Sequence, residues 1–176
     1  MTAEQIRTAV EQMVQEIAGE NAPYVMFYMD DDIKTAIRWN EQGKQEWFEH
    51  HMKVRIPEHI KEHHERRLTP ATAKVGDGAT VVFYSDRHSG TIVKVTKSTI
   101  TIRRDKATLD PSFKPEIIAG GFAGHCVNQN EQTYTYEPDE NGELHTLHWS
   151  KKYNSYGRPN DLRAIKGRHE FYDYNF

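Results

Sequence analysis

The feature that most limits the fold of this chain is a single change of hydrophobic period near residue 70. Before it, apolar residues recur at intervals of three and four, which is typical of amphipathic helices. After it, apolar and polar residues alternate, as in Thr99–Arg104, which is typical of half-buried strands. We therefore predict an α+β protein with a helical N-terminal segment at 1–68, a linker at 69–75 and a β-rich domain at 76–176. That domain is expected to be a small, mostly antiparallel β-barrel or curled sheet.

The N-terminal segment is predicted to form several short helices. A Thr2–Gln5 capping box marks the start of the first helix, and Gly19 marks its end. The apolar run Tyr24–Met29 predicts either a strand or a buried turn. Pro57 is expected to open a last, polar helix, because proline is favoured in the first helical turn.

The first part of the β-rich domain is predicted to be a meander of three strands. Val75–Tyr84 and Thr91–Thr96 alternate in polarity, and the turn-forming residues Ser85–Gly90 separate them. The third strand is Thr99–Arg104. Short consecutive strands joined by tight turns usually pair as neighbours, which is how a small barrel commonly begins.

The rest of the domain is expected to contain one hairpin between irregular segments. Gln132–Glu137 and Glu143–Trp149 are predicted to pair across an Asn-Gly dipeptide, which is a strong hairpin signal. Ala107–Ile118 contains two prolines and, like Tyr153–Arg163, is expected to be irregular. The aromatic C-terminus, Phe171–Phe176, is expected to pack as an edge strand.

Charge and composition exclude several classes of function. The net charge is −3, and residues 1–68 hold 9 Lys and Arg against 13 Asp and Glu, so no binding to long nucleic acid is expected. No stretch of about 20 apolar residues is present, so no membrane contact is expected. The one cysteine, Cys126, can form no internal disulfide, which favours a soluble protein in a reducing cytoplasm.

The glycine-rich stretch Gly120–Gln129 carries the residue types that suit a flat, polar ligand. Its three glycines allow sharp bends and close approach, while Phe122 can stack on a base. The amides of Asn128 and Gln129 can match the donors and acceptors of a nucleobase edge. In the sequence, His125 stands between Phe122 and these two amides. The alternative is a glycine-rich turn whose polar side chains satisfy their own backbone.

Cations near the strand ends suit phosphate groups. Arg104 and Lys106 close the third strand, and Arg87 lies in the turn before the second. A guanidinium can bind a phosphate through two parallel hydrogen bonds. Because a strand alternates its faces, only one of Arg103 and Arg104 can share a site with Lys106 or Arg87. These residues predict either a clamp for two phosphates or a salt-bridged strand end.

The candidate metal ligands and catalytic residues form incomplete patterns. His59 and His63 have the spacing of two metal ligands on one helix, but the Glu of a metalloprotease helix is missing. A solvated polar helix explains these histidines better.

Hydrolytic patterns are incomplete too. Ser85, Asp86 and His88 are the residue types of a hydrolytic triad. Within one short turn, however, they cannot easily reach the geometry of a triad, in which the base lies between the nucleophile and the residue that orients it. Cys126 follows His125 directly, and adjacent residues rarely align as nucleophile and base. We therefore predict no catalytic residue, no metal and no cofactor.

Several short motifs carry a resemblance to a known group of proteins. They are Gly-Asp-Gly-Ala-Thr (76–80), Ser-Asp-Arg-His (85–88), Arg-Asp-Lys-Ala (104–107), Gly-Gly-Phe-Ala-Gly-His-Cys-Val-Asn-Gln (120–129) and Tyr-Asp-Tyr-Asn-Phe (172–176). Through these motifs, residues 75–176 resemble small phage-encoded proteins and are similar to the phage anti-CBASS sponges. Those oligomers bind a cyclic nucleotide alarm signal and withhold it from the host effector. Residues 1–68 lie outside the resemblance.

The resemblance implies a non-catalytic protein of the host cytoplasm that binds a cyclic dinucleotide as a homo-oligomer, with a site completed by a second subunit. The residue types agree with this, because rings and amides suit the two bases and a few cations suit the two phosphates. The expected ligand-binding residues are Arg87, His88, Arg104, Lys106, Phe122, His125, Asn128, Gln129 and Tyr134.

Other classes of function stay open at this point. A β-barrel module for single-stranded nucleic acid would use the same aromatic residues, and its affinity would grow with strand length. A nucleotide-processing enzyme would use His125 or His88 as a general acid or base and would alter its ligand. A structural role in a virion would show neither behaviour.

Overall fold

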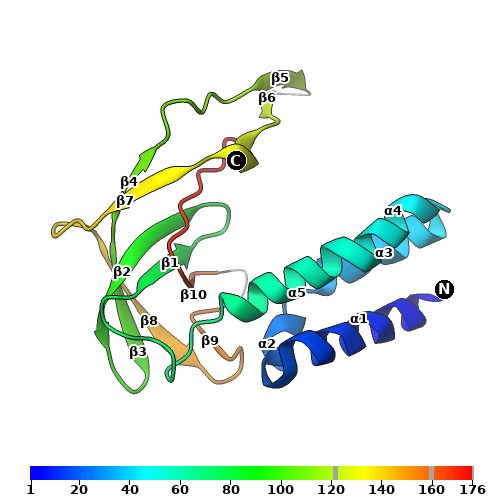
Figure 1. Ribbon diagram of the computed structural model, residues 1–176, viewed down its shortest axis with the longest axis horizontal. Helices are drawn as coiled ribbons and strands as arrows, with labels where there is room; N and C mark the ends of the chain where they lie inside the picture. Colours follow the sequence, from blue (N-terminus) through cyan, green and yellow to red (C-terminus); the bar gives the residue numbers. More distant parts are fainter. Residues whose placement is uncertain (121–122, 159–160, 176) are drawn as a thin grey trace. The chain divides into compact units, whose positions relative to one another are not determined.

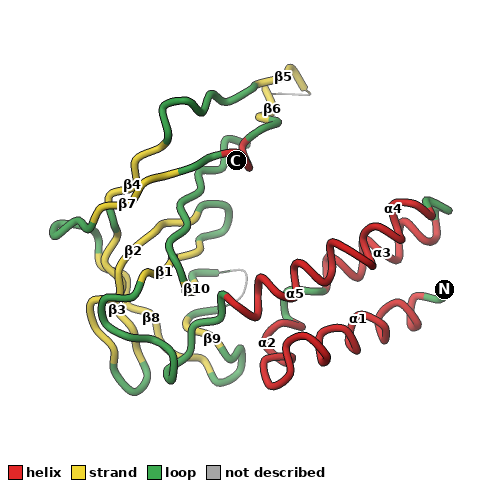
Figure 2. Tube along the Cα trace, viewed as in Figure 1, coloured by secondary structure: helices red, strands yellow, loops and turns green. Residues whose placement is uncertain are grey.

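The computed structural model describes residues 1–120, 123–158 and 161–175 of the chain. The chain divides into two compact units, Met1–Arg67 and Leu68–Phe176 (Figure 1). The first unit is helical and the second is built mainly from antiparallel strands (Figure 2). The α+β class predicted from the hydrophobic periods is therefore confirmed.

The first unit consists of short helical elements joined by tight turns. They are α1 (Ala3–Ala18), η1 (Gly19–Asn21), α2 (Ala22–Met26), α3 (Asp30–Glu41), α4 (Gln45–His50), η2 (His51–Arg55) and α5 (Ile56–Glu65). The capping box is confirmed: the Thr2 hydroxyl accepts from the Gln5 N–H at 3.2 Å, and the Gln5 side chain accepts from the Thr2 N–H at 2.8 Å. Gly19 caps α1 as predicted, with φ +51°.

Two local predictions for this unit need correction. The strand alternative for Tyr24–Met29 is wrong, because Pro23 opens α2 and the chain then turns. The last helix also begins earlier than Pro57 indicates, since α4, the π-helical turn η2 and α5 follow one another from Gln45 to Glu65. The wider turn of η2 ends at Arg55, two residues before Pro57. Proline has no N–H, so one helical hydrogen bond is missing there.

The helices of the first unit enclose one apolar core. Its fully buried members are Ile6, Val10, Val14, Val25, Met29, Ile33, Ala36, Ile56 and Ile60. Ile6, Val10 and Val14 in α1 follow the helical spacing seen in the sequence, so packing of amphipathic faces stabilises this unit.

The described residues of the second unit form ten short strands and one 3-10 turn. They are β1 (Gly78–Val82), β2 (Arg87–Val95), β3 (Thr99–Arg104), β4 (Lys106–Leu109), β5 (Ile117–Gly120), β6 (Ala123–Cys126), η3 (Gln129–Glu131), β7 (Tyr134–Glu137), β8 (Leu144–Ser150), β9 (Ser155–Tyr156) and β10 (Arg163–Lys166). Six of them form a sheet in the order β10-β1-β2-β3-β8-β9. An isolated bridge, Gly157↔Arg163, links the two edge strands, so the sheet curls toward itself.

The predicted meander of β1, β2 and β3 is confirmed by two antiparallel ladders. Its first turn is shorter than predicted, however, because β2 begins at Arg87 within the expected turn Ser85–Gly90. Arg87 pairs with Val82 on one side and exchanges two backbone hydrogen bonds with Phe171, both 3.0 Å long. Pairing with Val82 across the turn and with the distant Phe171 converts the end of the turn into strand.

The predicted hairpin between Gln132–Glu137 and Glu143–Trp149 is wrong, although both segments contain strands. β7 pairs with β4, and β8 pairs with β3, so β3–β4 and β7–β8 run side by side as one ribbon. The Asn-Gly turn is a loop on the side of this ribbon. A Cβ atom on Gly142 would lie 2.0 Å from the Arg104 carbonyl oxygen, which is why the loop packs there only with glycine.

The ribbon continues as an arm made of β4, β7 and the β5–β6 hairpin (Figure 1). The prediction of irregular chain is therefore wrong at both ends of Ala107–Ile118, because β4 runs to Leu109 and β5 begins at Ile117. It is also wrong for part of Tyr153–Arg163, which contains β9 and the first residue of β10. β4 and β10 pair with strands far away in the sequence, whereas β5 and β9 pair with neighbouring strands.

The inner face of the curled sheet carries the second core. Its buried members are Leu68, Ala73, Ala79, Val81, Ile92, Ile100, Ile102, Leu147, Tyr156 and Ala164. Cross-strand partners such as Ile92 and Ile102 share this face, as their alternating pattern predicts. Leu68 and Ala73, beside and within the predicted linker, pack into this core.

Candidate ligand-binding site

Residues 168–175, called the C-terminal strap below, run from the end of β10 past β2 to the arm, as the red trace in Figure 1 shows. The expected edge strand at Phe171–Phe176 is reduced, in the part of the chain that is described, to the single bridge between Arg87 and Phe171. The Arg87 guanidinium lies over the Phe171 ring at 5.4 Å, and its Nη1 lies 3.1 Å from His169 Nε2. Arg87 therefore binds the strap through its backbone and its side chain.

Side chains from the recognised motifs bind the backbone of the strap. The Asp86 carboxylate accepts from the N–H of Asp173 at 2.9 Å, and the Gln129 side chain accepts from the next strap N–H at 3.0 Å. The Asn175 amide accepts from the Cys126 N–H at 2.7 Å and donates to the Cys126 carbonyl at 3.1 Å. The motifs are thus brought together around the C-terminal strap.

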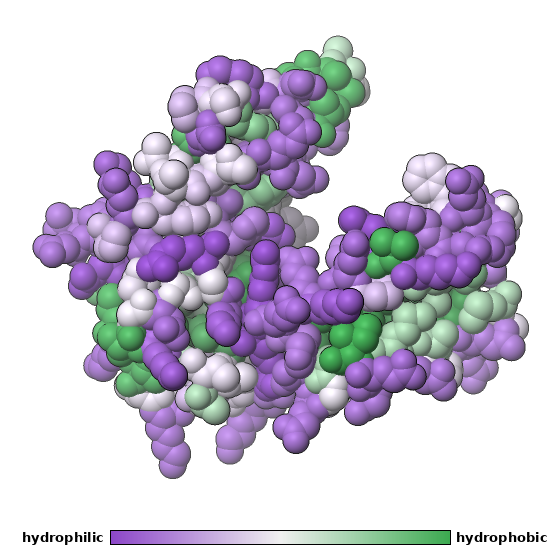
Figure 3. All heavy atoms as spheres, in the orientation of Figure 1, coloured by the Kyte–Doolittle hydropathy of each residue, from purple (hydrophilic) through white to green (hydrophobic). Residues whose placement is uncertain are grey.

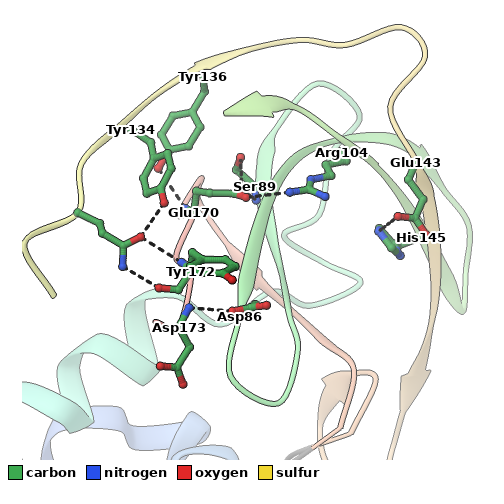
Figure 4. A network of polar contacts seen from close by, with 11 residues as sticks. Asp86, Ser89, Arg104, Tyr134, Tyr136, Glu143, His145, Glu170, Tyr172 and Asp173 are labelled. Carbon is green, nitrogen blue, oxygen red and sulfur yellow. Dashed lines mark hydrogen bonds and ion pairs between the residues drawn. The ribbon is translucent and has the colours of Figure 1, made fainter. Parts of the chain in front are cut away.

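Glu170 makes the buried polar contacts of the strap with β2, and its side chain is only 9% exposed (Figure 4). Its carboxylate accepts from the Ser89 N–H at 2.7 Å and from the Ser89 hydroxyl at 3.0 Å. Arg104 Nη2 lies 3.1 Å from the other carboxylate oxygen. A buried carboxylate with these donors is well compensated, so Glu170 anchors the strap to β2.

Tyr134, an expected base-stacking residue, belongs to the same network (Figure 4). Its hydroxyl donates to the Gln132 side chain at 2.6 Å, and that side chain bonds to both backbone groups of Tyr172. Burial, with a smaller effect of nearby Tyr174, raises the pKa of Tyr134 to about 12. Tyr134 is therefore a neutral donor near pH 7 and holds the strap through Gln132.

The amide of Asn128 is used by the backbone of its own loop. Its oxygen accepts from the Glu116 N–H at 2.8 Å, and its nitrogen donates to the Lys114 carbonyl at 2.9 Å. This agrees with the alternative interpretation of the glycine-rich stretch, a turn whose polar side chains bind their own backbone. His125 is exposed on β6, opposite Ile118. Phe122 lies outside the described residues.

His88 lies among rings at one end of the curled sheet. The Phe83 ring is 4.6 Å from the His88 ring and 5.7 Å from the His145 ring. Burial, followed by the nearby Arg104 charge, lowers the pKa of His88, so this side chain is neutral near pH 7. His145, which was not singled out from the sequence, is about nine-tenths buried and lies 3.6 Å from the Glu143 carboxylate.

The predicted phosphate cations are not brought together in one open site. Arg87 and Arg104 are bound to the strap, as described above. Lys106 lies apart on β4, where its exposed ammonium is 3.9 Å from the Glu137 carboxylate. The predicted salt-bridged strand end therefore describes Arg104 and Lys106 in this structure better than a shared clamp does.

A different group of cations lines a hollow that sequence analysis missed. This hollow, of about 610 Å³, lies over the start of β1 and the end of β10, and its walls include Lys74, Lys166 and Arg168. The side chains of Lys74 and Lys166 are exposed and form no hydrogen bond or ion pair with another described residue. Their positions are 92 residues apart, so no local motif connects them.

Two glycines belong to the lining of the hollow. The Gly167 N–H donates to the Gly78 carbonyl at 3.0 Å. A Cβ atom on Gly78 would lie 2.6 Å from Arg168 Nη1, so the missing side chain leaves room for Arg168 beside Gly78. Buried Asp105 holds Arg168 Nε at 2.7 Å, and Thr91 accepts from Arg168 Nη2 at 2.8 Å.

The histidines of the first unit are less solvated than predicted. His51 is buried, and its Nε2 lies 3.1 Å from the Asp32 carbonyl oxygen, while His59 Nδ1 lies 3.1 Å from the Asp32 carboxylate. His63 stacks on Tyr28 at 4.3 Å. No group of three or more His, Cys, Asp or Glu in the described ranges is arranged to hold a metal ion.

The chain matches no protein-family model, no curated protein and no solved structure. None of the helices in the described ranges is both long and apolar enough to cross a membrane. The function must therefore be argued from the geometry of the hollow and of the strap.

Proposed function

We propose that this protein binds a cyclic dinucleotide, or a related small nucleotide, and holds it without cleaving it. In the phage setting that the motifs imply, such binding would sequester an immune signal in the host cytoplasm and so act against host defence. The hollow over Gly78 and Gly167 is the proposed binding site.

The observation that carries this proposal is the set of three cations around an open hollow of about 610 Å³. Pockets for small molecules commonly measure about 300–1,000 Å³, so the volume suits a dinucleotide-sized ligand. The ammonium groups of Lys74 and Lys166 can each meet a phosphate oxygen. Arg168 is already fixed by Asp105, so it loses little side-chain freedom when a ligand binds.

The lining residues support binding rather than reaction. Thr72 has the only hydroxyl group among the described lining residues, and that hydroxyl lies 3.0 Å from the Thr69 hydroxyl and 3.4 Å from the Thr69 carbonyl. No histidine or cysteine is among the lining residues named for the hollow. Nucleophilic catalysis needs a nucleophile beside a base, and this wall offers neither in that arrangement.

A homo-oligomer is part of the same proposal. Ile117 and Ile118 in β5 and Val127, which follows β6, are 56%, 53% and 49% exposed, and Figure 3 shows hydrophobic side chains gathered at the β5–β6 hairpin. An isolated two-stranded hairpin is marginally stable in water, so a second copy packed on it would stabilise the arm. We also infer that the curled sheet acts as a small, incompletely closed barrel.

The test is a binding titration of the full chain with a panel of cyclic dinucleotides, followed by heating to recover the ligand. We expect a mobility shift at nanomolar to micromolar protein and chemically intact ligand afterwards. Lys74→Gln and Lys166→Gln should each weaken binding about tenfold, because a charge-assisted hydrogen bond contributes about 1.5–3 kcal/mol. Lys97→Gln, an exposed lysine outside the hollow, is the matched control and should change nothing.

Three outcomes would contradict the proposal in different ways. Altered ligand after incubation would indicate an enzyme. Affinity that rises with oligonucleotide length and falls steeply with salt would indicate a single-strand-binding module. Loss of binding in Asn128→Ala, with Lys166→Gln unaffected, would place the ligand at the glycine-rich loop instead of the hollow.

A further inference from the structure

The hollow contains one carboxylate among its cations. Asp77 lines it from the Gly-Asp-Gly turn before β1, is half-buried, and forms no side-chain hydrogen bond or ion pair with another described residue. Lys74 lies in the same turn, where its carbonyl accepts from the Asp77 N–H at 3.2 Å, yet the two side chains form no ion pair. The Asp77 carboxylate is thus unused by the fold.

An ionised carboxylate accepts hydrogen bonds and repels phosphate, so the part of a ligand that lies against Asp77 must be a hydrogen-bond donor. A cyclic dinucleotide carries donors on its bases and on its free ribose hydroxyls, but a single hydroxyl offers only one donor to a carboxylate. Guanine places two donors side by side, N1–H and the N2 amino group, which match the two oxygens of one carboxylate. Adenine pairs its amino donor with an acceptor, and uracil sets one donor between two acceptors.

We propose that Asp77 makes the hollow selective for a cyclic dinucleotide that contains guanine. This inference rests on the proposed function of the hollow, where Lys74, Lys166 and Arg168 bind the phosphates. A good bidentate pair discriminates between bases by about tenfold to a hundredfold, and the partial exposure of Asp77 places its effect near the lower figure. The carboxylate also disfavours ligands whose phosphates would lie against it.

The experiment compares the affinities of cyclic di-GMP and cyclic di-AMP for the full chain by calorimetric titration. The wild-type protein should bind cyclic di-GMP about tenfold more tightly. Asp77→Asn keeps the shape of the side chain but replaces one acceptor with a donor. This substitution should lower the affinity for cyclic di-GMP about tenfold and leave the affinity for cyclic di-AMP unchanged or slightly higher, so the preference disappears. Asp161→Asn, an exposed carboxylate outside the hollow, is the control and should keep the preference.

The outcomes separate this inference from the proposed function. If neither ligand binds, or if Lys166→Gln leaves both affinities unchanged, the proposed function itself fails. If both ligands bind the wild-type protein equally, the selectivity is refuted while the binding function stands. If Asp77→Asn raises the affinity for both ligands by the same factor, Asp77 only reduces the positive potential of the hollow, and the inference is overturned. Equal melting temperatures of the variants show that folding does not cause these changes.

Discussion

Replacing Glu170 with alanine should detach the C-terminal strap and destabilise the second unit by about 3 kcal/mol. The magnitude follows from its three contacts, at 2.7, 3.0 and 3.1 Å. Ser89 is fully buried, so Glu170→Ala leaves its N–H and hydroxyl without that acceptor, and an orphaned buried group costs about 1–3 kcal/mol. Arg104 is 39% exposed, so water can replace its lost partner and its share is below about 1 kcal/mol.

Hydrogen exchange followed by mass spectrometry is the appropriate assay, because it reports the second unit separately from the first. At about 3 kcal/mol, amides of β2 that exchange through opening of this unit should exchange roughly a hundredfold faster. Glu137→Ala provides the control, since its ion pair with Lys106 is long and exposed and should contribute less than about 0.5 kcal/mol. Equal, small effects of the two variants would show that Glu170 is no better anchored than a surface carboxylate, which would refute the reasoning.

The other predictions concern His88, Gly142 and Thr2. Burial and Arg104 lower the folded pKa of His88, so its contribution to stability is present above pH 6.5 and is lost as the pH falls through the folded pKa. His88→Gln should therefore reduce the loss of stability measured by thermal melting between pH 7.5 and pH 5, and an unchanged slope would contradict this. Gly142→Ala should destabilise the second unit by about 1–3 kcal/mol in urea unfolding, because its Cβ would meet the Arg104 carbonyl at 2.0 Å; a neutral effect would mean that the loop moves freely. Thr2→Ala should cost about 1 kcal/mol of the first unit's stability in the same assay, while Thr2→Ser should not.

The helical half could be predicted in detail because its determinants are local. The capping box at Thr2 and the cap at Gly19 depend on residues a few positions apart, and the buried faces repeat at helical spacing. The departures are local too. Pro23 lies in the first turn of α2, where the apolar run predicted a strand or a buried turn. The continuous helical run into α5 contains a π-helical turn that has no clear sequence signature.

Strand positions were predicted better than strand partners. β3 has the predicted bounds, β7 falls within its predicted segment, and β8 extends one residue beyond its own, to Ser150. Their pairing with β4 and β3 was missed because an Asn-Gly dipeptide also occurs in loops that interrupt a ribbon. A ladder depends on residues far apart in the chain, and a short strand such as β5 has too few residues to show a period of two.

The candidate site shows the same division between local and distant determinants. The motifs identified residues that share one region, yet the amides of Asn128 and Gln129 bind backbone groups of this chain. An amide that suits a nucleobase edge suits a peptide group equally, since both present donors and acceptors. No motif indicates a role for Lys74 or Lys166, because isolated lysines are common on protein surfaces. Only the pairing of β1 with β10 brings them to one hollow.

The strap and the hollow are parts of one arrangement, because they meet at Arg168. This residue lines the hollow and is also the first residue of the strap, whose next anchor, Glu170, is bound to Ser89. A cation that is fixed before the ligand arrives loses little conformational freedom on binding, whereas a free lysine side chain loses more. The residues that hold the strap can therefore act on ligand affinity without touching the ligand. Under the proposed function the motif residues and the hollow residues would have different tasks. The motif residues bind the strap that begins at Arg168, and the hollow residues would contact the phosphates and the base of the ligand.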